Sequence, residues 1–189
     1  MKHLDTKRLE TARLALRRYS VDDADAMYAN WASDPEVTKY LMWPHHETVE
    51  TSRRVLADWI GHYGEEDYYH WAIVLKENGD RPIGDIAVVR RDDAVEMVHI
   101  GYCIGRKWWN RGITTEALRE VIRFFFEEVD ANRVEARHDP RNVNSGKVMA
   151  RCGMRYEGTQ RQADRNNQGR CDSAMYAILA EEYARDTPH

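Results

Sequence analysis

The chain has 189 residues, of which 42% are apolar and 32% are charged, so it can form one packed domain and is not expected to be disordered. No apolar run approaches the about 20 residues that a membrane-spanning helix needs, and the N-terminal segment lacks the apolar core of a secretory signal. A formal net charge of -4 argues against a general nucleic-acid binder.

Charge is distributed unevenly along the chain, and the cysteine spacing bears on the kind of protein. Residues 1–100 hold 13 Lys and Arg against 19 Asp and Glu, whereas residues 101–189 hold 15 against 13. A local basic region in an acidic protein suggests a small polyanionic ligand, although chance variation of the surface explains it equally well. Cys103, Cys152 and Cys171 have no metal-like spacing, which predicts reduced thiols in a cytoplasmic protein.

The first half of the chain alternates strand and helix patterns before a run of three strands. Apolar alternation predicts a strand at 13–19, and helical periodicity predicts helices at 21–32 and 47–63, separated by an aromatic loop at 40–43. Three strands are predicted at 70–76, 83–90 and 95–104. The short turns between these three strands predict an antiparallel meander.

The second half opens with the strongest helical pattern in the chain, a broad apolar face over residues 115–129. The remaining pattern predicts a strand at 133–137, a short helix at 142–152 and a strand at 174–179. Because no repeat, linker or low-complexity stretch interrupts the chain, we expect one mixed α/β domain with a mostly antiparallel front half.

Residues 101–118 form the most informative stretch. A strand ends near Ile104, a turn carries Arg, Lys, Asn and Gly, and a long helix begins at once. Backbone N–H groups at a helix N-terminus lack internal partners and, together with the helix dipole, make an anion site. Gly112 would let the backbone approach a phosphate closely. An ordinary strand-to-helix turn is the alternative, and neither a Walker loop nor a dinucleotide fingerprint is present.

Three motifs in this order resemble the GNAT acetyltransferases of the RimJ/RimL (ribosomal-protein N-acetyltransferase) type. The turn 108–117 is similar to the pyrophosphate loop, 139–145 to the Asn-x-x-Ser helix start, and 152–158 to the Gly-Phe-x-x-Glu-Gly turn. The likeness implies an α/β, single-domain acyl-CoA N-acyltransferase (GNAT) fold with a mixed, mostly antiparallel sheet flanked by helices. The domain would cover residues 9–183, with terminal tails at 1–8 and 184–189.

The resemblance also implies acetyl-CoA as co-substrate, no metal, and direct transfer to a primary amine in a ternary complex. The strand before the loop would pair with pantetheine, and the loop amides would hold the pyrophosphate. Lys147 and Arg151, one helical turn apart, would reach the phosphates or else form a solvated face. The residues expected to bind the donor are Tyr102, Cys103, Ile104, Asn110, Arg111, Gly112, Ile113, Thr114, Thr115, Asn142, Lys147 and Arg151.

Catalytic roles follow from the same resemblance. Met149 stands where many members of the family carry a Tyr general acid, and Ser145 matches the Ser that fills this role in the RimJ/RimL branch. A helix-capping role is the alternative for Ser145. Asp164 matches the base proposed in some members, and Glu96, His99 or water are the other candidates.

The acceptor is left open as a peptide N-terminus, a polyamine, an aminoglycoside or an amino-acid-like metabolite. The aromatic loop and the acidic first half suit a cationic acceptor. The alternative function is a non-catalytic acyl-CoA-binding or regulatory module, which would keep the phosphate loop and lose the acid and the base. No nucleic-acid or membrane partner is expected, and the oligomeric state, a homodimer included, stays open.

Overall fold

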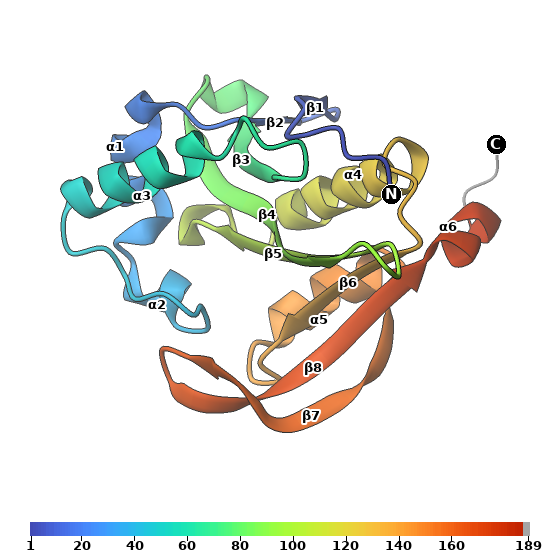
Figure 1. The fold of residues 1–189 in the computed structure, drawn as a ribbon. Coiled ribbons are helices and arrows are strands. Elements are labelled where there is room, and N and C mark those ends of the chain that lie inside the picture. The colour runs from blue at the N-terminus through green and yellow to red at the C-terminus, as the bar shows by residue number, and fades with distance from the viewer. Residues whose placement is uncertain (187–189) are drawn as a thin grey trace.

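The computed structural model describes residues 1–186, and within them eight strands form one sheet in the order β1-β2-β3-β4-β5-β6-β8-β7 (Figure 1). The strands are β1 (Leu9–Glu10), β2 (Leu14–Arg17), β3 (His70–Leu75), β4 (Pro82–Asp92), β5 (Met97–Ile104), β6 (Arg133–His138), β7 (Arg155–Asn166) and β8 (Gly169–Leu179). The helices are α1 (Ala24–Met27), α2 (Pro35–Thr38), α3 (Val49–Gly61), α4 (Ile113–Glu127), α5 (Val143–Arg151) and α6 (Ala180–Asp186). Among the strands of residues 1–186, only β5 and β6 pair in parallel, which confirms the predicted mixed, mostly antiparallel sheet.

Helices cover both faces of this sheet (Figure 1). On β3, Trp71 and Ile73 belong to the apolar cluster that contains Phe124 of α4, whereas Ala72 belongs to the cluster that contains Leu56 of α3. Successive side chains of a strand point to opposite faces, so a strand that is apolar throughout needs a helix layer on each side. Within the described part of the chain, no helix is long and apolar enough to cross a bilayer.

Several elements differ from the sequence prediction. The segment predicted as a helix at 21–32 is helical but irregular, with a 3-10 turn at Val21–Asp23, then α1, then a π-helical turn at Tyr28–Ala32. The sequence pattern does not predict β7, the first part of β8, or the short elements β1, α2 and α6. β7 is mostly exposed and pairs only with β8 at the edge of the sheet, so it lacks the apolar alternation by which strands are predicted.

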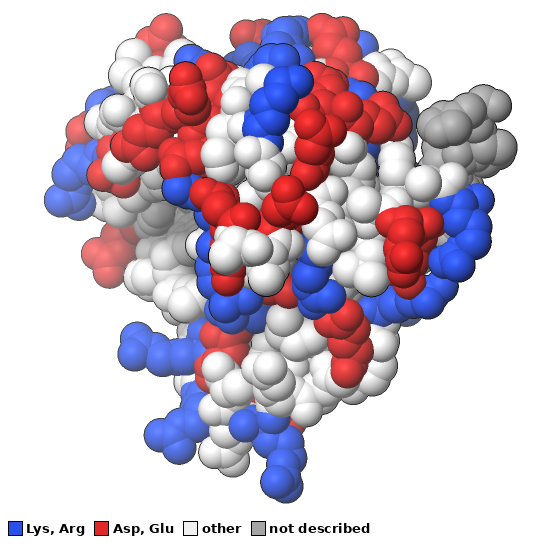
Figure 2. Space-filling view, turned by 45° about the vertical axis from the view of Figure 1, so that its right-hand side comes forward, with Lys and Arg blue, Asp and Glu red and all other residues white. Residues whose placement is uncertain are grey.

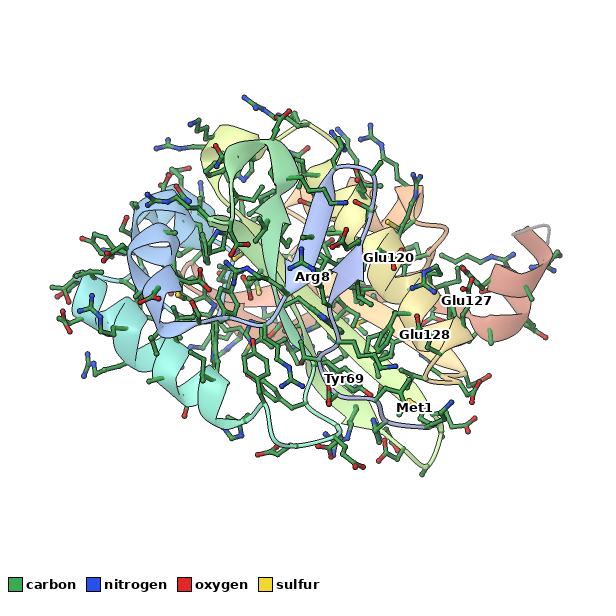
Figure 3. All side chains as sticks on the ribbon, turned by 90° about the horizontal axis from the view of Figure 1, so that it is seen from above. Met1, Arg8, Tyr69, Glu120, Glu127 and Glu128 are labelled. Atoms are coloured by element: carbon green, nitrogen blue, oxygen red, sulfur yellow. The ribbon has the colours of Figure 1, made fainter. Side chains whose placement is uncertain are left out.

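The first eight residues, expected to form a tail, lie against the domain. The Leu4 backbone N–H donates to the Tyr69 hydroxyl at 3.0 Å, and Thr6 is only 2% exposed. Figure 3 shows this segment running past Tyr69 toward the N-terminus. The tail expected at 184–189 overlaps the end of α6, and residues 187–189 lie outside the described residues.

Candidate active site

β5 and β6 separate part-way along their length. They pair in parallel only where Met97–His99 meets Arg133–Glu135, whereas β5 continues to Ile104 and β6 to His138. Beyond this point no ladder joins the two strands. The edge of β5 that faces β6 therefore offers main-chain N–H and C=O groups to an extended ligand, as an open sheet edge does.

A cavity of about 500 Å³ lies beside this free end of β5. Its walls come from β5, from the turn before α4 and the start of α4, from one side of α5 along its whole length, and from α2 and the segment that follows it. Every residue expected to bind the donor lines the cavity: Tyr102, Cys103, Ile104, Asn110, Arg111, Gly112, Ile113, Thr114, Thr115, Asn142, Lys147 and Arg151. Ser145 lines it as well, so residues from two distant parts of the sequence share one wall.

The turn before α4 is held in a conformation that exposes backbone donors. Asn110 and Gly112 have φ angles of 60° and 71°, in the left-handed region. α4 then begins at Ile113 with no side chain capping its first amides. The Trp109 indole N–H donates to the Ile104 carbonyl at 2.9 Å and braces the turn against β5. Free amides at the positive end of a helix dipole suit a phosphate group.

Charge is unevenly spread over the molecule. Figure 2 shows Asp and Glu gathered over the upper part of one face, while separate Lys and Arg side chains project from its lower part. Arg111, Lys147 and Arg151 line the cavity, and no ion pair joins them to an acid among the described residues. This end of the cavity therefore suits a polyanion.

Ser145 lies in the first turn of α5 and contacts a side chain of β5. Its Oγ lies 3.0 Å from the Tyr102 hydroxyl oxygen, and the Tyr102 hydroxyl donates to the Ser145 carbonyl at 3.1 Å. Burial raises the pKa of Tyr102 well above its ordinary value, so the phenol stays protonated at neutral pH. The sequence pointed only to the backbone of Tyr102. Its phenol enters the site because β5 and α5 face each other across the cavity.

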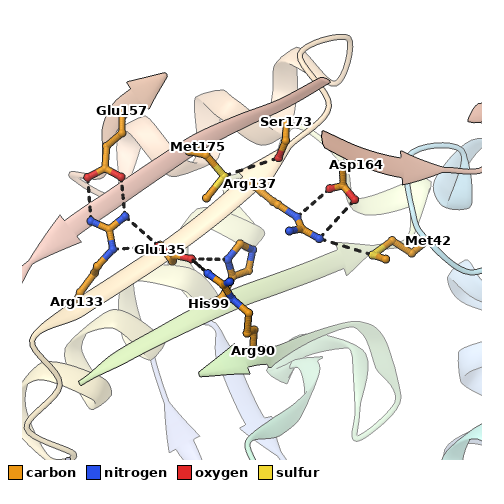
Figure 4. Close-up of polar contacts among 10 residues, drawn as sticks. All are labelled: Met42, Arg90, His99, Arg133, Glu135, Arg137, Glu157, Asp164, Ser173 and Met175. Atoms are coloured by element: carbon orange, nitrogen blue, oxygen red, sulfur yellow. Dashed lines mark hydrogen bonds and ion pairs between the residues drawn. The ribbon is translucent and has the colours of Figure 1, made fainter. Parts of the chain in front are cut away.

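The structure places Asp164 outside the residues that line the cavity. Its Oδ2 lies 2.8 Å from Nε of Arg137 (Figure 4). Its Oδ1 accepts the Arg165 backbone N–H at 2.8 Å. Both carboxylate oxygens are therefore engaged, and the structure does not bring Asp164 together with Ser145.

Of the other base candidates, His99 lies on β5 just where β6 separates from it. It is 4% exposed, and its Nδ1 lies 2.9 Å from Oε1 of Glu135 (Figure 4). Hydrogen bonds from His99, then from Arg133 and Arg90, lower the pKa of Glu135 to about 2, so this carboxylate is ionised at any ordinary pH. Glu96 lies in the turn just before β5, at the end remote from the cavity, where it pairs with the N-terminal ammonium at 3.3 Å.

The cysteines show no sign of activation. Burial raises the pKa of the Cys103 thiol well above its ordinary value. The thiol donates a hydrogen bond to Oδ1 of Asp85 at 2.7 Å. Burial also raises the pKa of Cys152 to about 12. A nucleophilic cysteine needs a lowered pKa, so both thiols are suited to packing. Among residues 1–186, no three His, Cys, Asp or Glu side chains are grouped to hold a metal ion.

The aromatic loop singled out in the sequence forms the far rim of the cavity, where Tyr40 and Leu41 are lining residues. Asn167, at the tip of the β7–β8 hairpin, donates its side-chain amide to the Thr38 carbonyl at 2.8 Å and to the Trp43 carbonyl at 2.7 Å. The hairpin thus holds the loop from both ends. No local signal in the sequence connects these two segments.

A mixed sheet whose parallel central strands separate beside an uncapped helix N-terminus is the arrangement of an acyl-CoA N-acyltransferase. Residues 13–155 match the acetyltransferase (GNAT) domain family, and the chain belongs to this family. It is therefore an acetyl-CoA-dependent acetyltransferase.

Similar proteins agree with this assignment. The uncharacterized N-acetyltransferase p20 of Bacillus licheniformis is 32% identical over 176 residues, 93% of this chain and 98% of that protein. The [ribosomal protein uS5]-alanine N-acetyltransferase of Escherichia coli K12 is 27% identical over 160 residues, 80% of this chain and 79% of that protein. A crystal structure of a GNAT-family acetyltransferase from Bacillus anthracis matches with a TM-score of 0.81 and 25% identity over 93% of this chain and 99% of that one. RimL, solved with coenzyme A, shares the fold at 19% identity and a TM-score of 0.81, over 92% of this chain and 98% of that one. The predicted GNAT fold and the likeness to the RimJ/RimL type are confirmed.

Proposed function

We propose that this chain transfers the acetyl group of acetyl-CoA directly to a primary amine while both substrates are bound. The observation that carries the proposal is the separation of β5 from β6 next to the uncapped N-terminus of α4. Pantetheine is an extended chain with amide groups, which the free edge of β5 can pair with. The pyrophosphate needs closely placed donors, which the turn at Asn110–Thr115 supplies.

The chemistry requires a proton for the departing thiolate. We assign this proton to the hydroxyl of Ser145, which lines the cavity on the first turn of α5. Met149 is 1% exposed in the core and has no proton to give. The Cys103 thiol keeps its proton and donates it in a hydrogen bond to Asp85, so we assign no covalent enzyme intermediate and the amine attacks the thioester itself.

The amine must be neutral to attack. An N-terminal amine with a pKa of about 8 is neutral in roughly a tenth of molecules at pH 7, whereas a lysine with a pKa of about 10.4 is neutral about once in 2,500. An N-terminal amine therefore needs only a weak base, and we assign this task to water. His99 is buried and does not line the cavity, so it would have to act through such a water molecule. Asp164, the base implied by the resemblance, would first have to leave Arg137.

For the acceptor, we propose the N-terminal amine of a polypeptide. The E. coli relative named above supports this choice, because it is named for acetylating an alanine of ribosomal protein uS5. Polyamines, aminoglycosides and amino-acid-like metabolites are the competing acceptors.

The test has two stages, donor binding and then transfer. Acetyl-CoA at about 100 times its Kd should stabilise the fold by about 2.7 kcal/mol, seen as a rise in Tm. A panel of N-terminal peptides and small amines is then scored for CoA release and for acetylated product by mass spectrometry. No Tm shift with millimolar acetyl-CoA contradicts the donor site. Binding without release of CoA for any amine favours the non-catalytic acyl-CoA-binding module.

A further inference from the structure

Tyr102 reaches Ser145 because of the alternation along β5. Ile100 and Ile104 lie in the cluster packed around α4, and Tyr102 points to the same face, whereas Cys103 lies in the cluster around α1 and α3. This face of β5 looks toward α5. The phenol oxygen ends 3.0 Å from Oγ of Ser145, at the cavity wall.

The single phenol hydrogen has two acceptors on Ser145. In one arrangement the phenol hydrogen is donated to the Ser145 carbonyl oxygen, at 3.1 Å. The Ser145 hydroxyl then donates its own hydrogen to the phenol oxygen, so that hydrogen does not point into the cavity. When the phenol hydrogen goes to Oγ instead, the serine hydrogen is free to point into the cavity. A negative charge developing in the cavity favours the second arrangement, because hydrogen bonds to charged acceptors are the stronger ones.

We propose that Tyr102 is a positioning residue that turns the Ser145 hydroxyl hydrogen toward the departing sulfur and replaces the proton that Ser145 gives away. The inference rests on the proposed function. As the N–C bond forms and the C–S bond breaks, the thiolate sulfur takes the Ser145 proton, the Ser145 oxygen takes the Tyr102 proton, and the phenolate takes one from water. The proton that the amine loses goes to solvent, so protons balance.

This arrangement compensates for a departure noted in the sequence. Buried Met149 stands at the α5 position where the resemblance leads one to expect a tyrosine acid. Here the tyrosine hydroxyl belongs to Tyr102 of β5. It contacts Ser145 of α5 and would act on the departing sulfur through the Ser145 hydroxyl.

The experiment is a double-mutant cycle on steady-state kinetics with the best amine from the panel. Tyr102→Phe removes one hydroxyl and keeps the ring in the wall. We expect kcat to fall about tenfold, the worth of one good hydrogen bond, with KM for acetyl-CoA within about twofold of wild type. Ser145→Ala should lower kcat about 100-fold or more, and Tyr102→Phe should cost nothing further in that background.

Two further variants separate positioning from structure. Tyr156→Phe removes a tyrosine hydroxyl that pairs with Thr159 at 2.7 Å on exposed β7, and kcat should not change. In Ser145→Thr, which keeps a hydroxyl, the tenfold dependence on Tyr102 should persist. Each variant is checked for an unchanged circular dichroism spectrum and for Tm.

Two outcomes in an active enzyme overturn this inference alone. In the first, the kcat of Tyr102→Phe stays within twofold of wild type. In the second, the two substitutions lower kcat additively, which means that Tyr102 does not act through Ser145. A wild-type chain that acetylates no amine overturns the proposed function, and this inference with it.

Discussion

Arg137 on β6 holds Asp164 on β7 across the intervening strand β8, with 2.8 Å between Nε and Oδ2 (Figure 4). The Asp164 carboxylate is 19% exposed, and Nη2 of Arg137 also lies 4.0 Å from Sδ of Met42 in the aromatic loop. The pair therefore joins the hairpin, the sheet and the loop at the rim of the site. Because its carboxylate is paired with Arg137, Asp164 is not free to accept a proton as a base.

Substitution of Asp164 by Asn should leave turnover at pH 7 within about fivefold of wild type, because the amine proton leaves by another route. The free energy of unfolding should fall by about 1 kcal/mol with loss of a partly exposed ion pair. Glu157→Gln is the matched control, since Glu157 pairs with Arg133 between the same two strands. A 100-fold loss of kcat/KM in Asp164→Asn alone would give Asp164 the role of base.

Gly112→Val should raise the Kd for acetyl-CoA by about tenfold or more, about 1.4 kcal/mol. The φ angle of 71° is unfavourable for any residue with a Cβ, and a β-branched side chain would stand where a phosphate must approach. A Cβ at Gly112 meets only Nη2 of Arg13, at 3.6 Å, so the fold should survive. Gly64→Ala, in open space and without a positive φ, is the control for calorimetric titration. Equal affinity of wild type and Gly112→Val for acetyl-CoA would show that this turn does not bind the phosphates.

Ser145→Ala should act on turnover and leave donor binding nearly unchanged, because a proton donor is used mainly in the transition state. The N-cap of α5 is Asn142, and the Ser145 hydroxyl is bonded to Tyr102. We therefore expect kcat to fall about 100-fold with little loss of Tm. If turnover stays within threefold of wild type while Tm falls, Ser145 has only a structural role.

Stability in acid should report on Glu135. Its pKa is lowered from 4.5 to about 2 in the folded chain, so its stabilising effect is complete above pH 4.5 and is lost as pH falls toward 2. A shift of this size corresponds to at most about 3 kcal/mol. Urea unfolding of wild type and Glu135→Gln at several pH values should show the difference between them shrinking over this window. A difference independent of pH would mean that the Glu135 charge does not stabilise the fold.

Asn167→Ala should loosen the aromatic loop without touching the phosphate end of the cavity. The substitution removes the donors to Thr38 and Trp43, at a cost of about 1 kcal/mol for each hydrogen bond. Amide hydrogen exchange over residues 38–43 should speed up, and KM for the amine should rise more than KM for acetyl-CoA. Gln168→Ala, the next residue in the hairpin, is the control. Unchanged exchange would show that the loop keeps its shape without the hairpin.

The sequence by itself determined the order of most elements, the long helix α4 and the turn before it. These features depend on short-range signals, since apolar periodicity, a glycine and a helix start all act within about one or two turns of chain. The Asn110–Thr115 turn is therefore predictable from the sequence as a candidate phosphate site, and the order of the three motifs along the chain points to the family.

Tertiary structure alone decided which side chains meet. Tyr102 and Ser145 are 43 residues apart, and their contact depends on which face of β5 looks at α5. Asp164 matched a catalytic position in the sequence, yet the register of β7 against β8 and the place of β6 beside β8 put it on Arg137. Strand order and register arise from packing between distant segments, and no local pattern carries that information.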